Sequence, residues 1–111
     1  MQIVFESPDP EAAALRTMTE RRARQLLKRL SWLAPRVKVH MSDVNGPLGG
    51  IDKRCQVEVT SSLAGPVVVT SMARDWRSAL QSALSRAART LLLNWQRSRT
   101  QRHSPPSVAA L

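Results

Sequence analysis

The middle of the chain contains a strictly alternating run of polar and apolar residues, Arg36-Val37-Lys38-Val39-His40-Met41-Ser42. Such alternation predicts a β-strand with one buried face and one polar face. The segment 45–50 is rich in glycine and predicts a loop, after which residues 54–59 alternate in the same way. A turn at 64–66 then leads to the β-branched run 67–70. These stretches predict three consecutive antiparallel strands.

The sequence on either side of these strands predicts one more strand and two helices. Residues 2–6 alternate and predict a short strand, and over residues 10–33 the apolar side chains recur at roughly helical spacing. Asp9 is expected to be the N-cap of this first helix, and Pro35 prevents its continuation. A second helix is expected to begin after Asp75. Its apolar stripe is the clearest periodic pattern of the chain and consists of Trp76, Leu80, Ala83, Leu84, Ala87, Leu91 and Trp95.

The order of these elements, β-α-β-β-β-α, predicts an α+β fold. Under the right-handed rule for crossover connections, the first two strands are parallel, and the last three strands form an antiparallel meander. Both helices are expected to cover one face of this four-stranded mixed sheet, which makes a two-layer sandwich. A chain of 111 residues has the length of one domain. We place that domain at residues 1–101 and expect residues 102–111 to form a disordered tail.

The chain is strongly basic, because 17 lysines and arginines face 8 acidic residues and leave a formal net charge of +9. No acidic residue follows Asp75. Solvated helices usually intersperse charges of both signs, since like charges repel at i,i+4 spacing. Uncompensated arginine on both helices therefore indicates a partner that supplies the anions, and arginine suits bidentate contact with phosphate.

The kind of nucleic acid follows from the motifs that the sequence lacks. It has no helix-turn-helix spacing, no zinc finger and no aromatic RNP-like strand motif. Trp76 and Trp95 fall on the apolar stripe of the second helix and are expected to pack in the core. Recognition of structured RNA through its backbone and shape fits best. The residues expected to contact RNA are Arg21, Arg22, Lys28, Arg29, Lys53, Arg54, Arg86, Arg89 and Arg97.

Few residues of the sequence are candidates for catalysis or metal binding. Cys55 lies in phase with Val57 and Val59 and is expected to be a small buried core residue. His40 lies on the polar side of its strand and has no second histidine or cysteine at ligand spacing. The glycine-rich segment 45–50 lacks the spacing of a phosphate-binding P-loop. We therefore expect no enzymatic activity, no metal, no cofactor and no small-molecule substrate.

The chain also lacks the patterns of a membrane protein or a secreted protein. No uninterrupted apolar stretch approaches the ~18 residues of a membrane span, and the first residues do not have the regions of a signal peptide. A single cysteine cannot form an internal disulfide, which fits a reducing compartment. These features predict a cytoplasmic protein that does not bind membranes.

Several short motifs carry a resemblance to a known family. They are Met1-Gln2-Ile3, Ala14-Leu15-Arg16, Asp43-Val44-Asn45-Gly46-Pro47-Leu48-Gly49-Gly50-Ile51-Asp52-Lys53-Arg54-Cys55, Arg74-Asp75-Trp76-Arg77-Ser78-Ala79-Leu80 and Ser85-Arg86-Ala87-Ala88-Arg89-Thr90-Leu91. With these motifs and its order of elements, the sequence resembles the ribosome hibernation-promoting factors, also called ribosome-associated inhibitor A or sigma-modulation proteins. The likeness covers residues 1 to about 99.

The resemblance implies binding in the neck and decoding region of the small ribosomal subunit, across the paths of messenger and transfer RNA, so that idle ribosomes are held inactive. Arg22, Arg86 and Arg89 fall on basic positions of the family, whereas its next basic positions are Leu93 and Asn94 here. Long members of the family carry a C-terminal dimerisation domain, for which this chain is too short. The resemblance thus implies a short, monomeric form.

Two other interpretations stay open at this point. A stand-alone module for double-stranded RNA shares the β-β-β-α arrangement, and it would bind a short RNA duplex about as well as ribosomes. A protein-binding regulator of a transcription factor would show binding that survives nuclease treatment.

Overall fold

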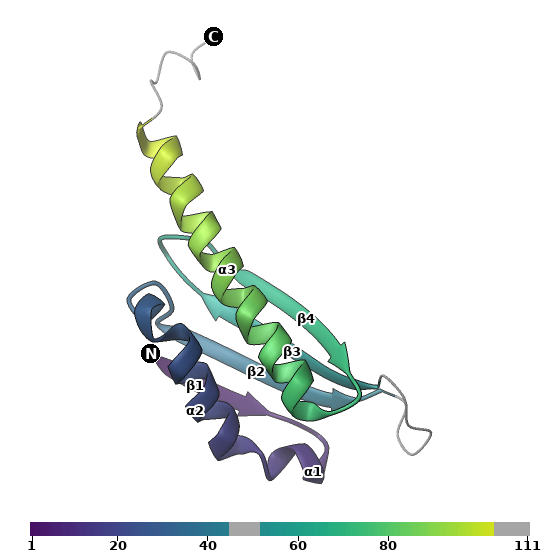
Figure 1. The fold of residues 1–111 in the computed structure, drawn as a ribbon. Coiled ribbons are helices and arrows are strands. Elements are labelled where there is room, and N and C mark those ends of the chain that lie inside the picture. Colours follow the sequence, from purple (N-terminus) through teal and green to yellow (C-terminus); the bar gives the residue numbers. More distant parts are fainter. Residues whose placement is uncertain (45–51, 104–111) are drawn as a thin grey trace.

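The computed structural model describes residues 1–44 and 52–103 of the chain (Figure 1). Its elements are, in chain order, β1 (Gln2–Glu6), α1 (Pro10–Ala13), α2 (Arg16–Leu27), the 3-10 helix η1 (Lys28–Leu30), β2 (Arg36–Asp43), β3 (Lys53–Thr60), β4 (Val67–Ala73) and α3 (Trp76–His103). The predicted loop 45–50 and residues 104–111 of the predicted tail lie outside the described residues. α3 continues through residues 102 and 103, which were expected to belong to the tail.

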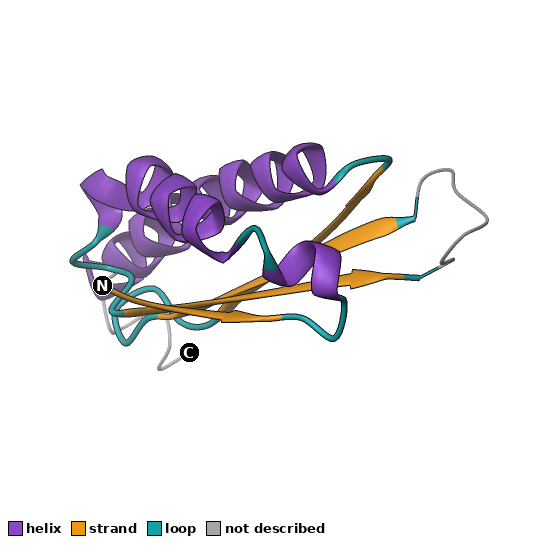
Figure 2. Ribbon diagram, turned by 90° about the horizontal axis from the view of Figure 1, so that it is seen from below, coloured by secondary structure: helices purple, strands orange, loops and turns teal. Residues whose placement is uncertain are grey.

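The strands form one four-stranded mixed sheet in the order β1-β2-β3-β4. β1 is parallel to β2, and β2, β3 and β4 are successively antiparallel. In this register Phe5, Val39, Val57 and Val69 lie side by side across the strands. Figure 2 shows that the helices cover one face of the sheet and leave the other face open. The predicted α+β fold, a two-layer arrangement with helices on one face, is thus confirmed.

The core lies between the covered face of the sheet and the helices. The alternating strand residues predicted to be apolar on one face are buried, namely Val37, Val39, Met41, Cys55, Val57 and Val59. From the apolar stripe of α3, Leu80, Ala83, Leu84, Ala87 and Leu91 are at most 1% exposed. Trp76 and Trp95 are partly buried and pack against this cluster, as expected. The periodicity of the sequence therefore identified most of the buried surface correctly.

The predicted continuity of the first helix is wrong, because the structure divides residues 10–33 into α1, α2 and η1. At the division, the amide of Leu15 donates to the carbonyl oxygen of Ala12. This is a step of three residues, as in a 3-10 turn, in place of the four-residue step of an α-helix. The chain changes direction there, so that α2 can lie over the sheet.

The start of α1 is attached to the end of β2 by two side chains. The hydroxyl of Ser7 donates to the carbonyl oxygen of Met41 at 2.7 Å, and the carboxylate of Asp9 accepts from the amide of Asp43 at 3.0 Å. Asp9 thus occupies the position before α1, as expected, but its side chain makes no capping hydrogen bond to that helix. The attachment fixes α1 at one end of the sheet, independently of α2.

Asp75 caps the start of α3. Its carboxylate accepts hydrogen bonds from the backbone amide of Ser78 at 2.8 Å and from the hydroxyl of the same residue at 2.9 Å. Both bonds stabilise the charged carboxylate and so lower the pKa of Asp75 below its ordinary value. The bond from the amide has the larger effect and the bond from the hydroxyl the next largest. The predicted start of the second helix is confirmed.

We expect the substitution Asp75→Ala to lower the midpoint of thermal unfolding by roughly 4 °C at neutral pH, because the first turn of α3 loses its cap. Since the pKa of Asp75 is lower in the folded state than in the unfolded state, this stabilisation is present above about pH 4. It is lost as the pH falls through the folded-state pKa. Circular dichroism melts of both proteins at neutral pH and at about pH 2.5 test this. An equal difference in midpoint at the two pH values would contradict the capping role.

Candidate nucleic-acid interface

A groove with a volume of about 610 Å³ lies between α2 and the first half of α3. Its lining consists of Met18, Arg22, Arg77, Ser78, Leu80, Gln81, Ser82 and Ser85. Arg22 comes from α2 and Arg77 from α3, and both side chains are exposed, so a guanidinium group stands on each wall. The Ser78 hydroxyl already donates to Asp75, whereas the hydroxyls of Ser82 and Ser85 and these guanidinium groups are hydrogen-bond donors. We call this feature the interhelical groove, and its donors suit an anionic ligand such as a phosphate.

The arginines of the helices form no ion pair within the described residues, although the carboxylate of Asp75 interacts electrostatically with Arg77. In the part of the chain that the structure describes, the ion pairs join Lys38 to Glu6 and Lys53 to Asp43 and Asp52. None of these pairs involves an arginine. The helical layer therefore keeps an excess of positive charge at its surface.

The open face of the sheet differs from the helical layer, because its basic side chains have acidic or amide neighbours. The Nζ atom of Lys38 lies 3.5 Å from Oε2 of Glu6. Arg54 donates to Gln56, which in turn donates to Glu58 along β3. A hollow of about 250 Å³ on this face is lined by Lys38, His40, Arg54, Gln56 and Glu58. Charges of both signs on this face give it little attraction for a polyanion.

Most of the predicted RNA contacts lie in the helical layer with exposed side chains. They are Arg21 and Arg22 on α2, Lys28 and Arg29 on η1, and Arg86, Arg89 and Arg97 on α3. Of these, Arg22 lines the interhelical groove. Arg97 lies elsewhere, beside the turn between β3 and β4, where it shares a hollow with Leu63 and Asn94. The structure therefore places these residues in one layer but not in one cluster.

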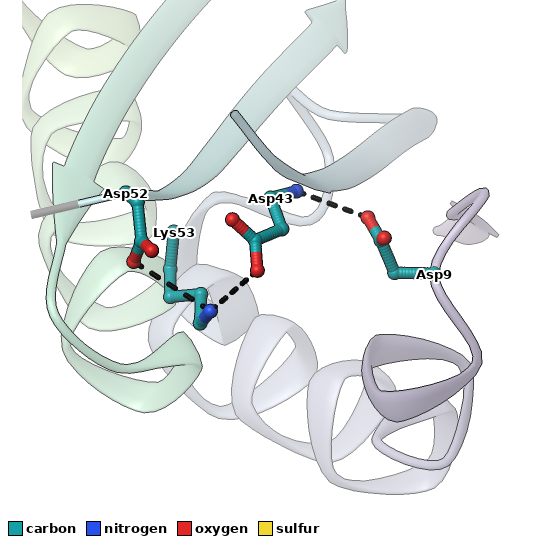
Figure 3. A network of polar contacts seen from close by, with 4 residues as sticks. All are labelled: Asp9, Asp43, Asp52 and Lys53. Atoms are coloured by element: carbon teal, nitrogen blue, oxygen red, sulfur yellow. Dashed lines mark hydrogen bonds and ion pairs between the residues drawn. The ribbon is translucent and has the colours of Figure 1, made fainter. Parts of the chain in front are cut away.

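The predicted contacts Lys53 and Arg54 do not join this layer. Figure 3 shows the Lys53 ammonium group between two carboxylates, 2.6 Å from Asp43 and 3.5 Å from Asp52. The hydrogen bond to Asp43 raises the pKa of Lys53 above its ordinary value, and the ammonium group also lies 5.4 Å from the centre of the Trp76 ring. Lys53 is thus occupied within the protein. Arg54 follows it in β3 and points to the opposite, open face, because successive strand residues alternate.

Two arginines donate hydrogen bonds to backbone carbonyl oxygens at the edges of the sheet. Arg86 donates to the carbonyl oxygen of Thr70 in β4 at 3.1 Å, and Arg24 donates to the carbonyl oxygen of Met1, just before β1, at 3.1 Å. β1 and β4 are the two outer strands of the sheet. Arg86 therefore has a structural contact of its own, and its replacement would change the edge of β4 as well as the charge of α3.

The other chemically reactive groups do not form a site. Cys55 is completely buried, as expected for a core residue, and burial raises the pKa of its thiol to about 12. A thiol with so high a pKa is protonated at neutral pH and is a poor nucleophile. Within residues 1–44 and 52–103, no group of three or more histidine, cysteine and acidic side chains is arranged to hold a metal ion. No helix in the same residues has the length and apolar character to cross a membrane.

No protein-family model matches the sequence, and a search among curated proteins finds no match. The likeness to the ribosome hibernation-promoting factors therefore stays a prediction from the sequence motifs. The interpretation of the surface depends on its geometry and charge.

Sequence reasoning missed Arg77 and the serines as part of one site. Arg77, Gln81 and Ser85 recur at steps of four residues, which places them on one side of a helix. This spacing could therefore have predicted that these three side chains line the same surface of α3. That this side of α3 faces Arg22 of α2 follows from the packing of both helices on the sheet, which no local pattern contains.

Proposed function

We propose that the protein binds the small ribosomal subunit through its helical layer and keeps the subunit inactive in translation, as a hibernation factor. The observation that carries this proposal is the interhelical groove, with exposed Arg22 and Arg77 on its walls and no ion-paired arginine among the described residues. Each guanidinium group can donate two parallel hydrogen bonds to one phosphate. Ribosomal RNA presents such phosphates in a fixed array.

An RNA surface suits this layer better than a lipid surface does. A helix that binds at a membrane inserts its apolar stripe among the lipids. Here Leu80, Leu84 and Leu91 of α3 are at most 1% exposed and cover the sheet. Insertion of α3 into a membrane would expose the core of the domain, whereas contact with RNA phosphates uses only the side chains that already face solvent.

The choice of ribosomal RNA among structured RNAs is supported by the family resemblance of the motifs. Bound in the neck and decoding region, a domain of this size would stand in the paths of messenger and transfer RNA. In this proposal the protein acts in the cytoplasm as a monomer. It needs neither a cofactor nor a catalytic step, because occupation of the site is sufficient for inhibition.

Co-sedimentation with purified ribosomes and separated subunits tests the proposal. We expect saturable binding near one protein per small subunit, which a duplex RNA competitor does not remove and which weakens steeply between about 50 and 200 mM salt. Complete removal by the competitor would instead indicate a general module for double-stranded RNA. Absence of ribosome binding, with capture of a protein that survives nuclease treatment, would indicate a protein partner. Either of these two results would contradict the proposal.

A further inference from the structure

Trp32 is a large aromatic side chain that the fold leaves exposed. It follows η1 by two residues, and 54% of its surface is accessible to solvent. Among the described residues, no other aromatic side chain is exposed, since Phe5 is buried and Trp76 and Trp95 are partly buried. The pattern of the first helix did not identify this position.

Two contacts hold the indole ring of Trp32 in place. Its Nε1 donates to the carbonyl oxygen of Arg29 at 3.1 Å. The ring also makes a T-shaped contact with Trp95 of α3, with the ring centres 5.0 Å apart and the planes at 85°. Trp95 in turn packs against the core and has the guanidinium group of Arg99 at 5.0 Å from its ring centre. Trp32 is therefore oriented before any ligand arrives, which lowers the entropic cost of binding.

The surroundings of Trp32 are positively charged. Lys28 and Arg29 are exposed on η1, and Arg99 is exposed on α3. The sequence has no acidic residue between Glu20 and Asp43, and none after Asp75. The two segments that meet at this ring therefore contribute cations and no carboxylate.

We propose that Trp32 is a stacking platform for an unpaired base of the bound RNA, and that Arg29 and Arg99 hold the phosphates beside that base. The inference rests on the proposed function and adds a site for one single-stranded nucleotide to it. An unstacked base offers a flat face to an aromatic ring, whatever its identity, and its backbone requires cations nearby. The contacts with Trp95 and Arg29 explain where Trp32 lies, but they leave half of its surface to solvent.

Two substitutions at this position separate stacking from packing. Trp32→Leu keeps an apolar side chain against Trp95 but cannot stack, whereas Trp32→Phe keeps an aromatic face. We expect Trp32→Leu to bind a single-stranded oligouridylate of about ten nucleotides roughly 10- to 100-fold more weakly than the wild type, and Trp32→Phe to stay within roughly threefold. For the small subunit too, we expect Trp32→Leu to bind more weakly than Trp32→Phe, and Trp32→Phe to bind nearly as well as the wild type.

Tryptophan fluorescence provides a readout that a purely structural role would not change. The oligouridylate should quench the emission of the wild-type protein, and most of this quenching should vanish in Trp32→Phe at saturating oligouridylate. A blunt RNA duplex, in which all bases are stacked, should bind without quenching. Thermal melts verify that each variant is folded, and if Trp32→Leu does not fold, the quenching in Trp32→Phe decides the question.

The possible failures of this test are distinguishable. Equal affinities of folded Trp32→Leu and wild type, or equal quenching in Trp32→Phe and wild type, would overturn the stacking platform while ribosome binding by the wild type still supported the proposed function. A wild-type protein that binds neither the subunit nor the oligouridylate would overturn both proposals.

Discussion

Replacement of Arg22 and Arg89 together by glutamate is expected to weaken binding to the small ribosomal subunit by roughly 100-fold or more. Arg22 stands on the wall of the interhelical groove, and Arg89 is exposed on α3. Neither side chain donates a hydrogen bond to another described residue, so the fold should not change. Loss of two phosphate contacts should also reduce the slope of log K against log salt by about 1.4 to 1.8. Sedimentation titrations at several salt concentrations measure both effects.

A matched control for this pair is Arg36→Glu with Arg54→Glu. Both residues are exposed on the open face of the sheet, and the control changes the net charge by the same amount. Because Arg54 donates to Gln56, a thermal melt verifies that the control is folded. We expect the control to bind within roughly threefold of the wild type at the same salt concentration, because only local contacts distinguish the two pairs. If the control loses binding and the helical pair retains it, the RNA contacts lie on the open face, and the proposed placement of the interface is wrong.

Leu84→Ala is expected to lower the free energy of unfolding by about 3 kcal/mol, within the 2–5 kcal/mol typical of buried leucines. Leu84 lies on the buried stripe of α3 and is completely shielded from solvent. Its removal would leave a cavity between α3 and the sheet. This loss is a large fraction of the about 5–15 kcal/mol that stabilises an ordinary domain. Urea unfolding followed by circular dichroism measures it.

Leu93→Ala provides the comparison for this substitution on the same helix. The Leu93 side chain is 47% exposed, so its truncation should cost no more than about 0.5 kcal/mol. A cost below about 1 kcal/mol for Leu84→Ala, or equal costs for both variants, would show that α3 does not cover the sheet as described.

The sheet was predictable from the sequence because strand alternation is a local property that burial enforces. Val37, Val39 and Met41 are buried, as their alternation required. The same alternation placed Lys53 in phase with Cys55, on the covered face, and Arg54 on the other face. The prediction that Lys53 and Arg54 contact RNA together with the helix arginines did not take this phase into account. In the structure the two side chains lie on opposite faces of the sheet, Lys53 beside Asp43 and Arg54 on the open face.

Other features could not be predicted, because they depend on contacts between distant segments. The break at Ala14 and Leu15 accompanies the attachment of Asp9 to Asp43 at the end of β2, a contact between segments far apart in the sequence. The interhelical groove likewise requires two helices that are far apart in sequence to lie side by side. Trp32, which follows η1, contacts Trp95 of α3, and no periodic pattern of the sequence relates these two residues.

The hydrogen bonds at the sheet edges bear on how the protein behaves at high concentration. An open β-sheet can grow by pairing with strands of other molecules, which is a route to fibrous aggregates. A strand that added to β4 at Thr70 would have to displace Arg86, and one that added beside Met1 would have to displace Arg24. Both edges also present a positive charge, which repels the same edge of a second copy. We therefore expect Arg24 and Arg86 to hinder strand addition at these two positions, whether or not RNA is present.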